Sequence, residues 1–142
     1  MKNLSFFYQY LVNPRDIGAI LPSSRFLADK MIERINFHQA KFIVEYGPGT
    51  GIFTERLLKN RNPKTIILLV ENNINFYNKL NEEFYKEKNL YIVNGSAENI
   101  DQYLKVYNLP FADYVISGLP FTSLPKEVSY NILLTTRGIT HS

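Results

Sequence analysis

A run of glycines and two acidic residues are the features of this sequence whose types and spacing suit chemistry. Residues 45–51 read Glu-Tyr-Gly-Pro-Gly-Thr-Gly, and Glu71 follows Gly51 by twenty positions. Glycines at every second position let the main chain turn sharply and leave room for a ligand against it. A carboxylate accepts hydrogen bonds from hydroxyl or ammonium donors. We therefore predict a turn that holds a small organic ligand through its backbone and nearby carboxylates.

The residues around this turn predict the elements that position it. An apolar, β-branched run before it indicates a buried strand over 41–47, and an amphipathic run after it indicates a helix over 51–60. A turn that follows a strand and opens a helix directs its backbone N–H groups into the crevice at the carboxyl ends of the strands. Ligands bind at this position in open α/β sheets.

Strands and helices alternate along the rest of the chain. Further strands are predicted at 65–72, 89–97 and 112–119, and further helices at 1–12, 23–35, 75–87, 98–107 and 124–136, with a polar tail after the last helix. Near-continuous apolar strands suit a parallel sheet that is covered on both faces. We expect one domain with a doubly wound, mostly parallel α/β sheet, in which a helical N-terminal segment, 1–40, lies on the substrate side of a cofactor-binding core, 41–142.

The composition narrows the chemistry. The chain has 142 residues, 45% of them hydrophobic and 20% charged, which is typical of a globular domain. It contains no cysteine, which excludes disulfides, thiolate metal sites and cysteine nucleophiles, and we predict no bound metal. A net charge of +3 gives a mild preference for anionic partners. Neither histidine, His38 or His141, lies in a motif, and no residue is assigned as a catalytic base.

The glycine spacing distinguishes this turn from two common nucleotide-binding turns. A dinucleotide turn reads G-x-G-x-x-G, but the third position after Gly49 is Ile52, and the Gly-Lys-Ser/Thr of a phosphate loop is missing. The string resembles motif I of the class I S-adenosylmethionine-dependent methyltransferases, E/D-x-G-x-G-x-G. This resemblance implies a Rossmann-like methyltransferase fold with S-adenosylmethionine as the cofactor.

The resemblance also implies a role for each part of the cofactor site. Glu71 would accept the ribose hydroxyls, Glu45 would serve the methionine amine, and the segment 96–98 would contact the adenine. Capping of a helix by Ser96, with an acid in its first turn, explains that segment equally well. The implied cofactor contacts are Glu45, Tyr46, Gly47, Pro48, Gly49, Thr50, Gly51, Glu71, Asn72, Ser96, Ala97 and Glu98.

The end of the fourth core strand resembles the acceptor loop of amino-methylating members of this family. The loop comprises Ser117, Gly118, Leu119, Pro120 and Phe121. In those enzymes an Asn-Leu-Pro-aromatic loop receives the amine, and its asparagine grips an adenine. Gly118 stands where the asparagine would be, so that side-chain grip is absent, while Phe121 keeps the aromatic ring. An amine acceptor is therefore expected, and a nucleobase is less favoured.

Two segments together resemble the bacterial phospholipid N-methyltransferases, which methylate phosphatidylethanolamine. They are residues 13–24, Asn-Pro-Arg-Asp-Ile-Gly-Ala-Ile-Leu-Pro-Ser-Ser, and the acceptor loop. The resemblance implies a phospholipid or membrane surface as partner and a cytoplasmic protein that is peripheral at the inner membrane face. Candidate substrate contacts are Tyr8, Arg15, Ser23 and Ser24. Core packing of the aromatic residues and helix capping explain these residues almost equally well.

Two alternatives remain open. Residues 8–14 faintly resemble the N-terminal segment of the ribosomal RNA adenine N6-dimethyltransferases. The methyltransferase fold also has the strand order 3-2-1-4-5-7-6, and the sequence supplies four core strands. Strand 112–119 would then be an exposed edge and a site for homo-oligomer pairing. Because the sequence supplies four core strands, the second alternative is a fragment that binds the cofactor without catalysing methyl transfer.

Overall fold

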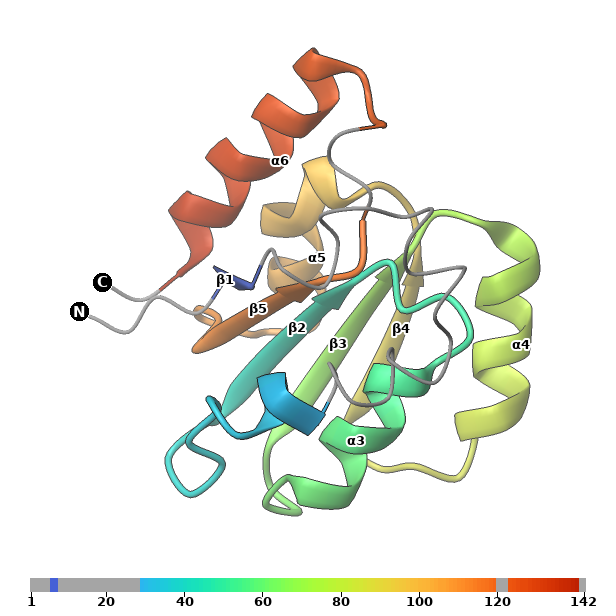
Figure 1. The fold of residues 1–142 in the computed structure, drawn as a ribbon, viewed down its shortest axis with the longest axis vertical. Coiled ribbons are helices and arrows are strands. Elements are labelled where there is room, and N and C mark those ends of the chain that lie inside the picture. Colours follow the sequence, from blue (N-terminus) through green and yellow to red (C-terminus); the bar gives the residue numbers. More distant parts are fainter. Residues whose placement is uncertain (1–5, 8–28, 120–122, 141–142) are drawn as a thin grey trace.

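A parallel sheet forms the centre of the molecule. The computed structural model describes residues 6–7, 29–119 and 123–140. Its five strands lie in the order β1-β5-β2-β3-β4 (Figure 1). They are β1 (Phe6–Phe7), β2 (Phe42–Tyr46), β3 (Ile66–Glu71), β4 (Leu90–Asn94) and β5 (Tyr114–Ser117), and every pairing is parallel. The four core strands have the relative order expected from the sequence, and the predicted fold class is confirmed.

Helices cover both faces of this sheet (Figure 1). They are α3 (Ile52–Asn60), α4 (Ile74–Phe84), α5 (Ile100–Val106) and α6 (Lys126–Ile139), and a short 3-10 helix, η2 (Ala97–Asn99), precedes α5. Residues 29–32, within the helix predicted at 23–35, are also helical. Phe53 and Leu57 of α3 pack on one face of the sheet, whereas Leu104 of α5 and Ile132 of α6 pack on the other. Within the described residues, no helix is long and apolar enough to span a bilayer.

The short strand β1 corrects two expectations. Residues 1–12 were expected to be helical, but Phe6–Phe7 form a strand that pairs with Val115 and Ile116 of β5. This expectation is wrong for the two described residues of the segment. The same pairing occupies the edge of β5 at Val115 and Ile116, so the open edge that motivated a homo-oligomer is not present there.

Helix α6 is longer than the sequence predicted. We expected it to end at residue 136 and the chain to continue as a polar tail, but the helix runs to Ile139. Its buried residues are Ile132, Thr136 and Ile139, which are spaced by four and three and so share one face. The sequence did not reveal this buried face, because Thr136 is polar. In the structure Thr136 is buried and its hydroxyl pairs with that of Tyr46.

Candidate functional site

The glycine turn follows β2 and leads directly into α3. Gly47, Gly49 and Gly51 have φ values of 62°, 57° and 86°, in the left-handed region that favours glycine. A Cβ on Gly47 would lie 2.8 Å from Leu119, and one on Gly51 would lie 3.1 Å from Phe84. Among the described residues, a Cβ on Gly49 would meet nothing nearer than the Gly47 carbonyl oxygen, at 4.0 Å. Gly49 is therefore the glycine of the turn that has open space beside it.

Glu71 ends β3 and is held beside this open position. Its Oε1 accepts a hydrogen bond of 2.9 Å from the Gly49 N–H, and its Oε2 accepts one of 3.0 Å from the Asn73 N–H. The side chain is only 6% exposed. Because a carboxylate already occupies the N–H of the turn, a phosphate would be repelled there. Free lone pairs on the same oxygens suit hydroxyl donors instead.

Glu45 is the second carboxyl of the site, and it is almost completely buried. Thr54 Oγ1 donates a hydrogen bond of 2.6 Å to its Oε1, and no other described residue bonds to it. Burial raises the pKa of Glu45 to about 8, the Thr54 hydrogen bond opposes this rise, and the charge of Glu71 adds to it. A cationic ligand beside Glu45 would favour the charged form and reverse the shift.

The two carboxyls lie on the same face of the sheet. Side chains alternate along a strand, so Glu45 shares the face of Ile43, and Glu71 shares the face of Leu69. Ile43 and Leu69 pack in the same cluster as Phe53 of α3. The carboxyl ends of β2 and β3 therefore present an acceptor for hydroxyls and an acceptor for a cation on either side of the open glycine turn.

Tyr46 contributes its main chain to this region, while its side chain points to the opposite face. The ring is fully buried, and its hydroxyl lies 2.7 Å from Thr136 Oγ1 of α6. Burial raises the pKa of the Tyr46 phenol beyond its usual range. The Tyr46 carbonyl accepts the Gly118 N–H at 2.7 Å, which ties the turn to the end of β5.

Three further predicted contacts take part in the turn or lie at its margin. The Pro48 carbonyl accepts the Gly51 N–H at 2.9 Å, which closes the turn. Thr50 and Asn72 are exposed. Their side chains are therefore accessible at the rim of the site, and their cofactor roles remain predictions.

The segment after β4 has the capping geometry that was the alternative reading of its sequence. Ser96 Oγ accepts the Glu98 N–H at 3.1 Å and donates to Glu98 Oε1 at 3.2 Å. Asn131 of α6 donates to Glu98 Oε2 at 2.8 Å, and Ala97 is buried. Both carboxylate oxygens of Glu98 thus have partners within the protein. A contact from this segment to adenine remains a prediction.

The predicted acceptor loop is described as far as Leu119. A Cβ on Gly118 would lie 2.6 Å from the Gly47 carbonyl oxygen, so the glycine turn packs directly against this residue. Ser117 is buried, and its Oγ accepts the Leu119 N–H at 3.2 Å. The remaining predicted substrate residues lie outside the described residues: Pro120, Phe121, Tyr8, Arg15, Ser23 and Ser24.

The sequence reasoning missed three side chains that position the site. They are Thr54 on Glu45, Asn131 on Glu98 and Thr136 on Tyr46. Thr54 follows Gly51 by three residues, so its place in the first turn of the helix was a usable signal. The other two lie on α6, and nothing local in the sequence links them to their partners.

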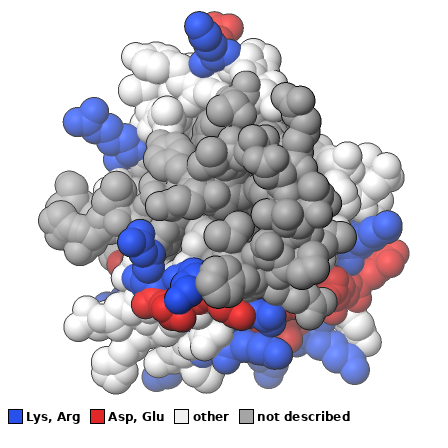
Figure 2. Space-filling view, viewed as in Figure 1, with Lys and Arg blue, Asp and Glu red and all other residues white. Residues whose placement is uncertain are grey.

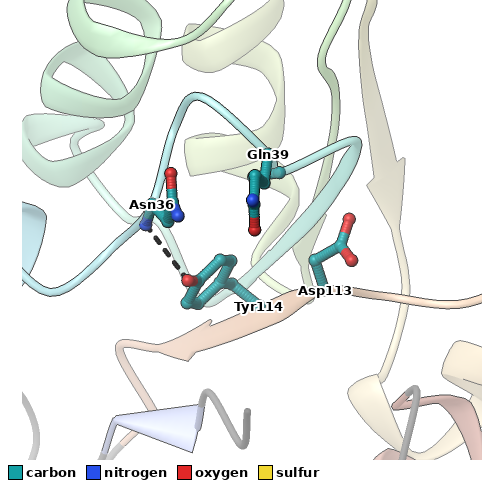
Figure 3. Close-up of a pocket in the computed structure, with 5 residues that line it drawn as sticks. Asn36, Gln39, Asp113 and Tyr114 are labelled. Carbon is teal, nitrogen blue, oxygen red and sulfur yellow. Dashed lines mark hydrogen bonds between the residues drawn. The ribbon is translucent and has the colours of Figure 1, made fainter. Parts of the chain in front are cut away.

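A separate cavity lies at the opposite end of the strands (Figure 3). It has a volume of about 170 Å³ and is lined by Asn36, Gln39, Ala40, Asp113 and Tyr114. The Asn36 N–H donates to the Tyr114 hydroxyl at 3.0 Å, and Asp113 Oδ2 accepts the N–H groups that begin β2, at 2.7 and 2.9 Å. These polar groups satisfy the backbone, and we assign the cavity no chemistry.

Comparison with known proteins agrees with this geometry. The chain is 29% identical over 123 residues to an ornithine lipid N-methyltransferase from Singulisphaera acidiphila, covering 87% of this chain and 64% of that protein. It is 32% identical over 116 residues to ribosomal RNA small subunit methyltransferase A from Borreliella burgdorferi, covering 75% of this chain and 40% of that protein. The chain thus spans less than two thirds of the length of either relative.

A solved structure identifies the fold of the chain, and a family model identifies its family. The O-methyltransferase TomG from Streptomyces achromogenes, solved in complex with SAM, superposes with a TM-score of 0.62 at 15% identity, over 84% of this chain and 51% of that one. At this identity the likeness shows the fold, which is that of the class I methyltransferases. The family model for ribosomal RNA adenine dimethylase matches residues 3–135. The chain therefore belongs to the ribosomal RNA adenine dimethylase family.

Proposed function

We propose that the protein is an S-adenosylmethionine-dependent methyltransferase that methylates the amine of a lipid head group, such as that of phosphatidylethanolamine. Family membership and fold support the reaction class. The ornithine lipid N-methyltransferase, which aligns with 87% of the chain, supports a lipid amine as acceptor. The single observation that carries the choice of acceptor is the packing of Gly118.

The residues of the turn fit the cofactor on three counts. Glu71 has lone pairs for the ribose hydroxyls and is already oriented by two backbone N–H groups. Glu45 is a buried carboxyl with one hydrogen-bond partner among the described residues, and the ammonium of the methionine moiety would supply the countercharge that favours its ionised form. Gly49 leaves the main chain open between them. A polyphosphate ligand fits poorly, because Glu71 occupies the N–H that would hold it.

Gly118 favours a lipid amine over a nucleobase. A polar side chain at this position would have to begin with a Cβ that lies 2.6 Å from the Gly47 carbonyl oxygen. Such a distance is too short for a Cβ, so the backbone here accepts only glycine without rearrangement. The side-chain grip on an adenine amine, implied for the adenine-methylating relatives, is therefore sterically blocked. A primary amine on a flexible head group needs no such grip.

Methyl transfer depends mainly on the position of the acceptor amine relative to the methyl group. S-adenosylmethionine supplies a methyl group on a sulfonium. The amine nitrogen attacks this methyl carbon in line and S-adenosylhomocysteine leaves with the electrons of the S–C bond, so holding the amine near the methyl provides most of the rate enhancement. The chain contributes the turn that fixes the cofactor and the end of β5 where the acceptor enters. An ammonium acceptor must first lose its proton, and we assign no residue to that step.

A ribosomal RNA adenine is the second candidate acceptor. The ribosomal RNA adenine dimethylase model matches residues 3–135, and the relative from Borreliella burgdorferi is named as a methyltransferase of small-subunit ribosomal RNA. This candidate requires the adenine amine to be held by the main chain or by residues beyond Leu119, because Gly118 has no side chain. The two acceptors are distinguished directly by a transfer assay.

The first experiment is calorimetric titration of the chain with S-adenosylmethionine and S-adenosylhomocysteine. We expect saturable binding that Glu71→Ala abolishes and that Glu82→Ala, a change at an exposed glutamate on α4, leaves unchanged. Glu71→Gln keeps the length of the side chain and one of its two backbone hydrogen bonds while removing its charge, and it is used if the alanine variant fails to fold. No binding by folded wild-type protein would overturn the cofactor assignment.

The second experiment identifies the acceptor. Transfer of a labelled methyl group is measured to vesicles that contain phosphatidylethanolamine and, separately, to unmethylated small-subunit ribosomal RNA. We expect label in the lipid fraction and none in RNA. Label in the RNA alone would overturn the lipid assignment while leaving the methyltransferase assignment intact.

A further inference from the structure

We propose that the outward face of α6 docks on an anionic lipid surface and so presents the acceptor loop to the head groups. This inference rests on the proposed function, because it assumes that the acceptor is a membrane lipid. It assigns the docking surface to a helix within the described residues.

The two faces of α6 differ from those of an ordinary surface helix. The inward face carries the buried stripe that packs on the sheet. The outward face, where polar residues are usual, carries Tyr130, Leu133 and Leu134, which are 61%, 37% and 49% exposed. Three large apolar side chains so close together form an exposed patch of the kind that marks an interaction site.

Two cations border this patch. Lys126 precedes Tyr130 by four residues and Arg137 follows Leu133 by four, so all share the outward face, and both cations are exposed. The acidic residue of α6 is Glu127, in its first turn. Figure 2 shows mainly uncharged surface at the upper left, over α6, with blue side chains at its margin and a red one beside the topmost blue side chain. Apolar side chains bordered by cations are the pattern of helices that lie in anionic membrane interfaces.

The charges favour a lipid surface over a second copy of the chain. In a two-fold contact between two α6 helices, the same face meets itself. Lys126 and Arg137 of one copy would then face the same two cations of the other, and only in an antiparallel contact would the single Glu127 lie near Arg137 and offset part of this repulsion. Like charges in such a contact repel, whereas phosphate head groups would neutralise both residues.

Helix α6 also has fixed connections to the site. It follows the acceptor loop in the chain, and its inner side donates from Asn131 to Glu98 and bonds through Thr136 to Tyr46. A helix held in this way keeps a fixed orientation relative to the carboxyl ends of the strands. Docking its outer face on a membrane therefore sets the distance between the head groups and the end of β5.

The test is co-sedimentation of the full chain with vesicles. Vesicles of phosphatidylcholine mixed with phosphatidylglycerol are compared with vesicles of phosphatidylcholine alone, at low and high salt. Two double variants remove the proposed contacts, Tyr130→Ser with Leu134→Ser and Lys126→Glu with Arg137→Glu. The matched controls are Tyr85→Ser and Lys79→Glu, which change an exposed tyrosine and an exposed lysine elsewhere on the surface.

We expect the wild type to bind the anionic vesicles and each double variant to lower the partition coefficient by about tenfold or more, because the apolar contact and the charge attraction both contribute. The control variants should bind as the wild type does, and high salt should weaken the binding of the wild type to anionic vesicles. Equal partitioning of wild type and both double variants would overturn the proposal. A second result would also overturn the proposal. In it, the wild type forms a dimer and does not bind vesicles, and the double serine variant is a monomer.

Failure of this inference can be told apart from failure of the proposed function. Cofactor titration is repeated on each variant, and methyl transfer is measured to phosphatidylethanolamine dispersed in detergent, where no membrane docking is needed. Wild-type activity in detergent together with unchanged vesicle binding by the variants would overturn the docking surface alone. Loss of cofactor binding in the wild type would overturn the proposed function.

Discussion

Thr54 Oγ1 lies 2.6 Å from Glu45 Oε1, and both side chains are almost completely buried beneath the glycine turn. The bond joins the end of β2 to the first turn of α3, across the turn that the two elements enclose. It also gives a buried carboxyl the hydrogen bond without which its burial would be costly. The pair therefore controls both the shape of the turn and the protonation of Glu45.

Thr54→Val should destabilise the protein by about 1–3 kcal/mol, because the variant keeps the shape of threonine and removes the donor to a buried carboxyl. Unfolding in urea, followed by circular dichroism, measures the change. Thr54→Ser keeps the hydroxyl and is the matched control, with a smaller loss that reflects its missing methyl group. Equal stability of Thr54→Val and the wild type would contradict a structural role for the bond.

The pH dependence of stability should report the buried Glu45. Its pKa rises from 4.5 in the unfolded chain to about 8 in the folded one. The stabilising contribution of the bound proton is thus complete below pH 4.5, decreases as the pH rises towards 8 and is lost above it. Between these values the folded state holds one proton more, so the free energy of unfolding should fall by about 1 kcal/mol per pH unit from this group.

The control for this prediction is Glu45→Gln, which has the same shape and cannot ionise. The difference in unfolding free energy between wild type and variant, measured in urea at several pH values from 5 to 9, isolates the contribution of Glu45. A difference that does not change with pH would show that Glu45 is charged in the folded protein throughout. Addition of S-adenosylmethionine should reduce the slope, because its ammonium favours the carboxylate.

Two glycine substitutions should change the stability of the protein in opposite directions. Gly118→Asn places a Cβ 2.6 Å from the Gly47 carbonyl oxygen, so we expect a loss of stability of about 1–3 kcal/mol together with weaker cofactor binding. A Cβ at Gly138 of α6 meets no atom of residues 6–7, 29–119 or 123–140 within 4 Å. Gly138→Ala should therefore stabilise the protein by up to about 1 kcal/mol, through helix propensity.

Thermal and urea unfolding of the two variants measure these changes, and calorimetry measures the affinity for S-adenosylmethionine. A stable Gly118→Asn variant with unchanged affinity would show that the backbone can move away from Gly47. The argument against a nucleobase acceptor would then lose its steric basis.

Most of the fold was predictable because its signals are local. The apolar strand before Gly47 and the turn chemistry after it predicted β2, α3 and the position of the site. The parallel sheet followed from strands that are apolar on both faces. Strand β1 was missed because two phenylalanines in an aromatic segment carry no periodicity that separates a strand from a helix, and only their pairing with β5 decides.

The places of Glu45, Gly49 and Glu71 at the ends of two strands could be predicted, because the glycine motif and the end of the next apolar run are local signals; their roles toward a ligand stay predictions. The side chains that support them could not be predicted. Asn131 and Thr136 follow their partners by 33 and 90 residues. Such a contact depends on how α6 packs across the sheet, and its polar partners look like surface residues in the sequence.

The hydrogen bond between Tyr46 and Thr136 allows the link from α6 to the turn to be measured. Tyr46→Phe and Thr136→Val each leave one buried polar group without its partner, and each should cost about 1–3 kcal/mol. The double variant removes both groups, so its loss should be smaller than the sum of the single losses by about 1 kcal/mol or more. A double-mutant cycle in urea measures this coupling energy, and Tyr130→Phe, at an exposed tyrosine of α6, should have no effect. Strictly additive losses would show that the two hydroxyls do not interact in the folded protein, and that α6 is held to β2 by apolar packing alone.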